Sequence, residues 1–226
     1  MKLEKVTYDG KREAKRWYDD ACGTALAMEL VGERWSLLIV RELMFGPRRF
    51  SEVKAGLNGV SANVLTQRLE GLERAGIVER RQLPSPANAQ VYALTPWGRE
   101  SEAAIQALGR WAVRSPAHDV TLPLSPASMM MSFRTMYPGG GRGRYGFRFG
   151  RDVFVARLGE TVEVERAEPV EVDAVFEAAD PRAVAGAVYA KVSLAELEAA
   201  GALRITGDRA AAQRFIELFG LPDKIA

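Results

Sequence analysis

Residues 51–95 read SEVKAGLNGVSANVLTQRLEGLERAGIVERRQLPSPANAQVYALT, and the spacing of their hydrophobic residues changes at Gly76. Ahead of Gly76, leucines recur at helical intervals, which indicates a helix over residues 62–75. Ser61 stands just before this helix and is a favourable N-cap. The preceding residues predict a shorter helix that follows Ser51 and ends at an Asn-Gly turn. Two helices joined by a tight turn are therefore expected.

The residues after Gly76 have the pattern of a β-hairpin. Residues 77–83 and 90–95 are strand-like, and the turn-rich sequence PSPANA joins them. Pro96 suits the first turn of a closing helix. The apolar residues of that helix form one stripe: Ile105, Leu108 and Trp111. Helix, turn, helix and hairpin in this order predict a winged helix-turn-helix, whose second helix can enter the ~12 Å wide major groove of DNA.

The exposed face of the second helix is expected to read bases. If the leucines face inward, the opposite side presents polar side chains: Asn63, Thr66 and Gln67, with Arg68 at the margin. Asn and Gln can hydrogen-bond adenine edges, Thr can touch a thymine methyl, and Arg can reach guanine or phosphate. A small, amide-rich surface of this kind favours base readout.

Groups suited to phosphate surround that helix. They precede the first helix, cap the second or lie on the wing: Arg48, Arg49, Ser61, Arg80, Arg81 and Asn88. Each of them alone could equally be a solvated polar side chain. Taken together in this order, they favour double-stranded DNA as the partner.

Composition excludes several other classes. With 47% hydrophobic and 27% charged residues among 226, the chain can bury a core and keep a soluble surface. Cys22 is the only cysteine and His118 the only histidine, so one chain cannot form a disulfide or a cysteine-based zinc site. No nucleophile and base pair stands out. We expect no metal site, no cofactor and no enzymatic activity.

The N-terminus MKLEKVTYDGKREAKRW is charged throughout and lacks the apolar core of a signal peptide. No apolar run approaches the ~20 residues that cross a bilayer. A cytoplasmic protein without a membrane segment is therefore expected.

Charge and proline content divide the chain in two. Residues 1–115 carry 18 Lys and Arg against 14 Asp and Glu, whereas residues 116–226 carry 13 against 15. The basic excess favours polyanion binding by the first part. A short proline-containing stretch follows the closing helix and marks a linker. We expect two domains, residues 1–115 and residues 125–226.

The second domain is expected to be α+β. From Ser128 the pattern becomes strand-rich, with half-buried strands around residues 145–149 and 162–164. Helices are expected over residues 181–191 and 194–200, the latter opened by a capping box. A short LRIT strand and an amphipathic helix end the chain.

Residues 22–111 resemble the HxlR family of winged-helix regulators. The resemblance rests on Cys22, on a late Trp and on ordered motifs: GERWSLLIVREL, GPRRFSEV, Gly-Val-Ser then VLTQRLEGLERAGIVERR, and VYALTPWG. It implies a homodimer on an inverted repeat, with the closing helix and the N-terminal segment at the dimer interface. This sequence departs from the residues common in the family at Gly23, Glu33–Arg34 and Gln90–Val91. The DNA sequence that family members recognise therefore cannot be carried over to this protein.

The ending ALRITGDRAAAQRFIELF resembles the sterol-carrier-protein-like fold, whose members bind apolar ligands between sheet and helices. That resemblance implies a cavity lined by apolar and aromatic residues: Phe147, Phe149, Val188, Tyr189, Phe215 and Phe219. Core packing alone would also explain these residues. The sequence thus predicts a DNA-binding transcriptional regulator, tuned by a small apolar effector in its second domain.

Cys22 has two interpretations. We expect a small buried apolar residue, since free cysteine is often buried and nearby Asp19 and Asp20 would raise the pKa of its thiol. Some relatives use a cysteine here as a redox sensor, so a redox-responsive regulator is the alternative. Two further alternatives are an enzyme or lipid-binding protein with an accessory winged helix, and a winged helix used only for protein contacts.

Overall fold

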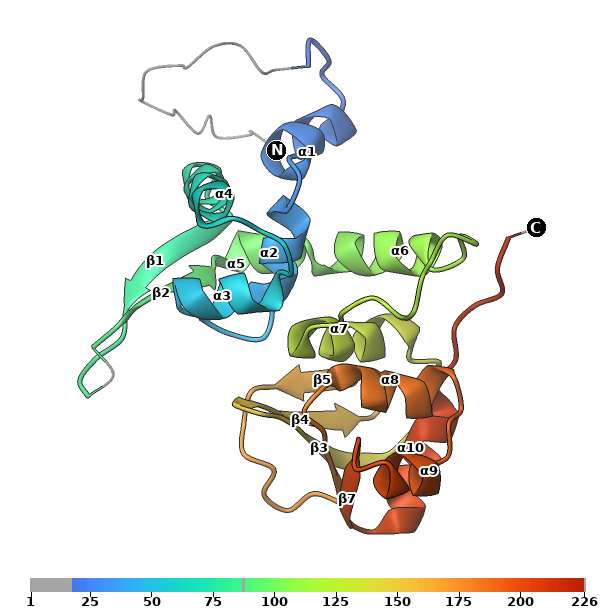
Figure 1. Cartoon of the computed structure of the whole chain (residues 1–226). Coiled ribbons are helices and arrows are strands. Elements are labelled where there is room, and N and C mark those ends of the chain that lie inside the picture. The colour runs from blue at the N-terminus through green and yellow to red at the C-terminus, as the bar shows by residue number, and fades with distance from the viewer. Residues whose placement is uncertain (1–17, 87, 226) are drawn as a thin grey trace.

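The computed structural model describes residues 18–86 and 88–225 (Figure 1). The N-terminal half holds helices and a two-stranded hairpin, and the C-terminal half holds a five-stranded sheet with its own helices. In Figure 1 the hairpin projects away from the body, α7 lies between the N-terminal helices and the sheet, and α6 runs alongside α7. Both halves mix helices and strands, in agreement with the sequence prediction.

The elements of the N-terminal half follow the predicted order: α1 (Gly23–Val31), α2 (Ser36–Leu43), α3 (Phe50–Gly56), α4 (Ala62–Arg74), β1 (Val78–Gln82), β2 (Gln90–Leu94), α5 (Pro96–Glu100) and α6 (Glu102–Ala112). Ser61 caps α4 as predicted, because its Oγ accepts a hydrogen bond from the Val64 amide. Gly76 follows α4 with φ 72°, a left-handed conformation that glycine adopts without strain. β1 and β2 pair in antiparallel register.

Two local predictions need correction. α3 begins at Phe50, so Ser51 lies inside its first turn and does not cap it. The carboxylate of Glu52 accepts from the Arg49 amide at 2.7 Å, which satisfies a donor at the start of the helix. The closing helix is divided in two at Ser101, whose hydroxyl donates to the Gly98 carbonyl oxygen at 2.7 Å.

The C-terminal half comprises α7 (Pro126–Met136), β3 (Gly143–Phe149), β4 (Asp152–Leu158), β5 (Val162–Glu165), β6 (Ala174–Glu177), α8 (Pro181–Tyr189), α9 (Leu194–Ala199), β7 (Arg204–Gly207) and α10 (Arg209–Leu218). The strand order is β5-β4-β3-β6-β7. β3 and β6 are parallel, and the other neighbours are antiparallel. The predicted capping box of Ser193 and Glu196 opens α9.

The sequence interpretation missed α7. Strands were expected from Ser128, but residues 126–136 form a helix capped by Ser125, whose Oγ accepts from the Ser128 amide at 3.0 Å. Most of its side chains are buried, including Met129, Met130 and Phe133. A helix buried on nearly all sides lacks the polar stripe by which helical periodicity is recognised.

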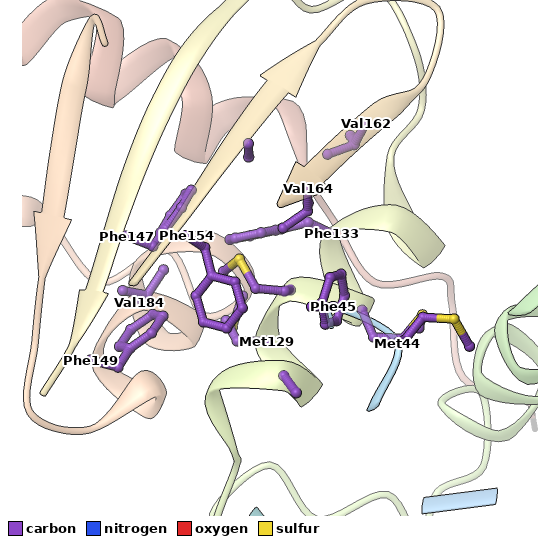
Figure 2. Close-up of a cluster of buried hydrophobic side chains, with 14 of the residues drawn as sticks. Met44, Phe45, Met129, Phe133, Phe147, Phe149, Phe154, Val162, Val164 and Val184 are labelled. Atoms are coloured by element: carbon purple, nitrogen blue, oxygen red, sulfur yellow. The ribbon is translucent and has the colours of Figure 1, made fainter. Parts of the chain in front are cut away.

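The two halves share one hydrophobic core. Phe45, which follows α2, meets Phe154 of β4 edge to face, with ring centroids 5.9 Å apart. Figure 2 shows Phe45 beside Met129 and Phe154 of the C-terminal half, with Met44 on the other side of Phe45. The winged-helix half and the sheet are therefore in direct contact and do not merely share a linker.

Within residues 18–86 and 88–225, no helix has the length and apolar character needed to cross a bilayer.

Candidate nucleic-acid interface

α4 separates a buried face from an exposed one, as predicted. Its leucines, Leu65, Leu69 and Leu72, are at most 1% exposed. The predicted base-reading side chains stand on the opposite side and are exposed: Asn63, Thr66 and Gln67. The structure therefore brings two amides and a hydroxyl together on one solvent-facing surface, and Ser61 lies exposed at its N-terminal end.

The turn before α4 sets the angle at which that surface is presented. Gly59 has φ 85°, and the Val60 amide donates to the Leu57 carbonyl oxygen at 3.2 Å. Val60 itself is buried, so the turn is anchored to the core. The N-terminus of α4, with its unpaired amides and partial positive charge, is thus held at the surface, where it favours anions.

Arg68 lies at the edge of the exposed face but is held by the loop between α1 and α2. Its Nε donates to the Arg34 carbonyl oxygen at 3.0 Å, and its Nη2 lies 2.8 Å from the Glu33 carboxylate. These contacts fix α4 against the preceding loop. A DNA contact by Arg68 would require it to leave them.

Arg48 and Arg49 have different surroundings. Arg48 is 7% exposed, and its guanidinium lies 3.0 Å from the Asp152 carboxylate on β4. Its backbone exchanges two hydrogen bonds with Tyr92 of β2, which adds a short bridge to the wing. Arg49 is exposed, and no ion pair joins its guanidinium to any residue of the described chain. Of the two, Arg49 alone has the accessibility that a phosphate contact needs.

The partner of Arg48 belongs to a cluster of charges between the halves. Asp152 also pairs with Arg166, and burial together with the positive charge of Arg48 lowers the pKa of Arg166. Glu42 of α2 is fully buried and accepts from the Ser125 hydroxyl at 2.6 Å. Sequence reasoning missed this cluster, because its members are up to 124 positions apart and no local pattern connects them.

The arginines of the wing are exposed but paired. Arg80 lies 2.9 Å from the Glu73 carboxylate of α4, and its guanidinium stands 5.8 Å from the ring centroid of Tyr92. Arg81 pairs with Glu79 on the same strand. Exposed ion pairs of this kind contribute ~0–1 kcal/mol, so DNA phosphates can replace the carboxylates at small cost.

Asn88, at the tip of the wing, has φ 32° and accepts a hydrogen bond from the Gln82 side-chain amide at 3.0 Å. This bond crosses the hairpin near its end. The Asn88 amide group keeps its two N–H donors available for a phosphate.

The residues predicted to line an apolar ligand site lie mostly in solid core. Ring centroids of Phe147 and Phe215 are 5.4 Å apart, and those of Phe215 and Phe219 are 5.0 Å apart. Phe149 stacks 6.4 Å from Phe147, and Val188 is buried in the same core. Tyr189 lines a cavity together with residues of the segment before α7 and of α8, and none of the other five lines that cavity. Five of the six residues are therefore packed in the hydrophobic core.

Cys22 is exposed, which corrects the expectation that it is buried. It occupies the N-cap of α1, where the Thr24 amide, then the Thr24 hydroxyl and the Ala25 amide, lower the pKa of its thiol. The predicted rise caused by neighbouring aspartates is therefore wrong in direction. Asp20 instead accepts from the Cys22 backbone amide at 2.9 Å.

Two helices, a tight turn and a hairpin, with an amide-bearing helix face set among arginines, define a winged helix-turn-helix protein of the transcriptional-regulator class. The family model described as HxlR-like helix-turn-helix matches residues 30–119. The HTH-type transcriptional regulator YodB of Bacillus subtilis is 40% identical over 86 residues, which cover 38% of this chain and 77% of YodB. The chain belongs to the HxlR-like helix-turn-helix family.

Two further sequence relatives agree with this assignment. The HTH-type regulator YtfH of Escherichia coli is 32% identical over 109 residues, covering 48% of this chain and 86% of YtfH. For Rv3095 of Mycobacterium tuberculosis the identity is 44%, and the match covers 38% of this chain but only 53% of that protein. The solved structure of reduced YodB covers 43% of this chain and 98% of its own, at 36% identity and a TM-score of 0.39.

Proposed function

We propose that the protein is a homodimeric transcriptional regulator that reads a palindromic operator with α4 of each subunit. The observation that carries this proposal is the exposed face of α4, where Asn63 and Gln67 present amides suited to adenine edges. Arg49 and the wing arginines flank this face and are suited to phosphate. Membership of the HxlR-like family supports the same function.

A dimer would place the two recognition helices about one DNA turn apart. α6 supports this part of the proposal, because Leu108 is 46% exposed and Trp111 is 74% exposed. Leu26 and Met28 of α1 are exposed as well. Large apolar side chains of this kind on two helices are suited to burial against a second copy.

The proposed roles divide between the two parts of the chain. Residues 1–115 bind DNA and dimerise, and residues 125–226 tune that binding in response to a small apolar molecule. The shared core and the Arg48–Asp152 ion pair support such tuning, because through them a change in the sheet would reach the residues just before α3.

Genomic footprinting of the purified protein, followed by binding measurements on the site it finds, tests the proposal. Gln67→Ala should change the preferred bases, since one bidentate contact contributes ~1–3 kcal/mol of discrimination. Arg81→Ala should weaken binding to all DNA sequences alike, and it should reduce the salt dependence of that binding by about one counterion. Gln213→Ala, which removes an exposed amide from α10, is the matched control and should change neither.

Unchanged operator affinity and unchanged base preference in Asn63→Ala, Gln67→Ala and Arg81→Ala together would refute the placement of DNA on α4 and the wing. If Gln213→Ala weakens operator binding as much as Gln67→Ala does, the loss reflects impaired folding in general.

Control by oxidation through Cys22 is a second candidate. The specific observation in its favour is an exposed thiol whose pKa is lowered by amides at the start of α1. YodB itself has been solved in quinone-bound and diamide-treated forms. Operator affinity that falls on treatment with diamide in the wild type and stays constant in Cys22→Ser would support this candidate.

A further inference from the structure

A cavity of about 450 Å³ lies where the connector between the halves crosses α7 and α8. Connector residues His118, Val120 and Leu122 form one wall, Ser132 and Tyr189 form the floor, and Leu221 of the C-terminal tail closes the side. Pockets for small ligands have volumes of ~300–1,000 Å³ and consist mainly of apolar surface with a few polar groups. This cavity has both properties.

The connector wall contains apolar side chains that the folded chain leaves uncovered. Val120 is 64% exposed and Leu122 is 62% exposed, although both border the cavity. The C-terminal tail and α8 complete the lining without covering them. An apolar occupant would remove this surface from water, which favours its binding.

The floor provides one hydrogen-bond donor. The hydroxyl groups of Ser132 and Tyr189 lie 2.6 Å apart, and their mutual hydrogen bond uses only one of the two O–H donors. Burial raises the pKa of Tyr189 to about 12, so its phenol stays neutral at physiological pH. The remaining donor can therefore bind an acceptor atom of an occupant.

The charged groups at the rim already have partners. Arg182 pairs with Asp180 at 2.6 Å and donates to the Thr121 carbonyl oxygen at 3.0 Å, which ties α8 to the connector. Burial and the charge of Lys224 lower the pKa of His118, which favours the neutral form of its ring. Asp119 also lines the cavity, and its carboxylate accepts hydrogen bonds from the Thr121 amide and hydroxyl at 2.9 and 2.7 Å. The lining therefore offers no unpaired cation to an anionic head group, and its carboxylate is already hydrogen-bonded, which favours an uncharged occupant.

We propose that this cavity binds a small, uncharged, mostly apolar molecule that carries one carbonyl oxygen, with that oxygen on the Ser132–Tyr189 hydroxyl pair. The site differs from the ring cluster on β3 and α10, which is closed by packing. Its regulatory meaning rests on the proposed function, whereas its existence as a binding site does not.

The position of the cavity connects an occupant to α6. Val113, the C-cap of α6, lines the cavity, and Lys224 donates to the Val113 and Ser115 carbonyl oxygens at 2.8 and 3.1 Å. The Ile225 amide donates to the Arg114 carbonyl oxygen at 2.8 Å, and Figure 1 shows the tail returning to this end of α6. An occupant would thus contact the segment that sets α6, the proposed dimer helix, against the C-terminal half.

Prodan, a neutral naphthalene ketone whose emission shifts to the blue in apolar surroundings, is the probe. Titration into the full-length protein, without DNA, should give a saturable blue shift. Ala185→Leu places three more carbons in the cavity and should weaken binding at least tenfold. Ala195→Leu makes the same change on the exposed side of α9 and should leave it unchanged.

Tyr189→Phe keeps the ring and removes a hydroxyl, so it should weaken binding ~2–10-fold, the effect of one hydrogen bond. It also serves as the second variant if Ala185→Leu fails to fold, which circular dichroism would show. Absence of a saturable shift in the wild type overturns the proposal. Equal affinity in the wild type, Ala185→Leu and Tyr189→Phe overturns it as well.

Because the titration contains no DNA, its outcome is independent of operator recognition. A protein that binds prodan in the cavity but protects no genomic site would overturn the proposed function alone. If the protein protects a genomic site but its prodan affinity is the same in these variants as in the wild type, the cavity proposal alone is overturned.

Discussion

Arg48 and Arg49 are adjacent in the sequence and identical in chemistry, yet the fold uses them differently. Arg48 is buried against Asp152 of β4, and Arg49 is exposed beside α3. From the sequence, both were expected to bind phosphate. The difference arises because the chain before α3 runs along the wing, paired with Tyr92, so that alternate side chains face the body and the solvent.

This pair provides a matched test. Arg48→Ala should lower the free energy of unfolding by about 3 kcal/mol, because it leaves Asp152 with fewer partners in a mostly buried site. Arg49→Ala should leave stability unchanged and weaken DNA binding across sequences. Urea unfolding and operator binding measure the two effects. A stability loss in Arg49→Ala as large as that in Arg48→Ala would contradict the assignment.

Cys22 leads to a second residue-scale prediction. Since amides of α1 lower the pKa of its thiol, the thiolate should form at lower pH than in a free cysteine peptide. The rate of reaction with an aromatic disulfide reagent, followed against pH, should therefore reach its midpoint below that of the peptide. Thr24→Val removes the hydroxyl contribution and should move the midpoint upward. A wild-type midpoint at or above that of the peptide would show that the thiol is not activated.

At the scale of elements, α6 has two different sides. One side packs on α7, where Arg134 holds the Glu102 carboxylate with contacts of 2.8 and 2.9 Å and Arg110 donates to the Thr135 carbonyl oxygen. The other side presents Leu108 and Trp111 to solvent. Of the predicted apolar stripe, Ile105 packs against the shared core, whereas Leu108 and Trp111 stay exposed, which is the reason to expect a second subunit there.

Leu108→Glu should shift the protein from dimer to monomer in sedimentation analysis, because two carboxylates would face each other across a symmetric apolar interface. Operator affinity should fall with it, while the circular dichroism spectrum stays the same. Val170→Glu, which places the same charge on an exposed aliphatic residue of a distant loop, is the control. A dimer that survives Leu108→Glu would move the interface away from α6.

At the scale of the whole molecule, the halves should unfold together. Phe45 and Phe154 are in contact across the boundary, and Glu42 and Ser125 are hydrogen-bonded across it. A core shared in this way favours a single cooperative transition. All four tryptophans precede residue 112, so their fluorescence reports on the N-terminal half.

Phe154→Ala, a change in the C-terminal half, should therefore lower the midpoint of the tryptophan transition. The expected loss is about 3–5 kcal/mol, as for other buried phenylalanines. Val170→Ala, on an exposed loop of the same half, should leave the midpoint in place. If Phe154→Ala shifts only the circular dichroism signal and not the fluorescence, the halves unfold independently.

Local interactions could be predicted from the sequence. The Ser61 cap, the leucine face of α4, the wing hairpin and the Ser193 capping box all depend on residues within a few positions of each other, so their patterns are visible along the chain. The exposure of Asn63 and Gln67 followed from the same periodicity. For this reason the winged helix and the candidate base-reading face were predictable.

Only the tertiary structure decided how the parts meet. α7 was invisible as a helix because surrounding elements bury nearly all of it. Arg48 pairs with Asp152, 104 positions away, and the cavity at Tyr189 is lined by the end of α6, the connector, α7, α8 and the C-terminal tail, which meet only in the fold. Burial and ion pairing between distant residues depend on three-dimensional packing, for which local spacing carries no signal.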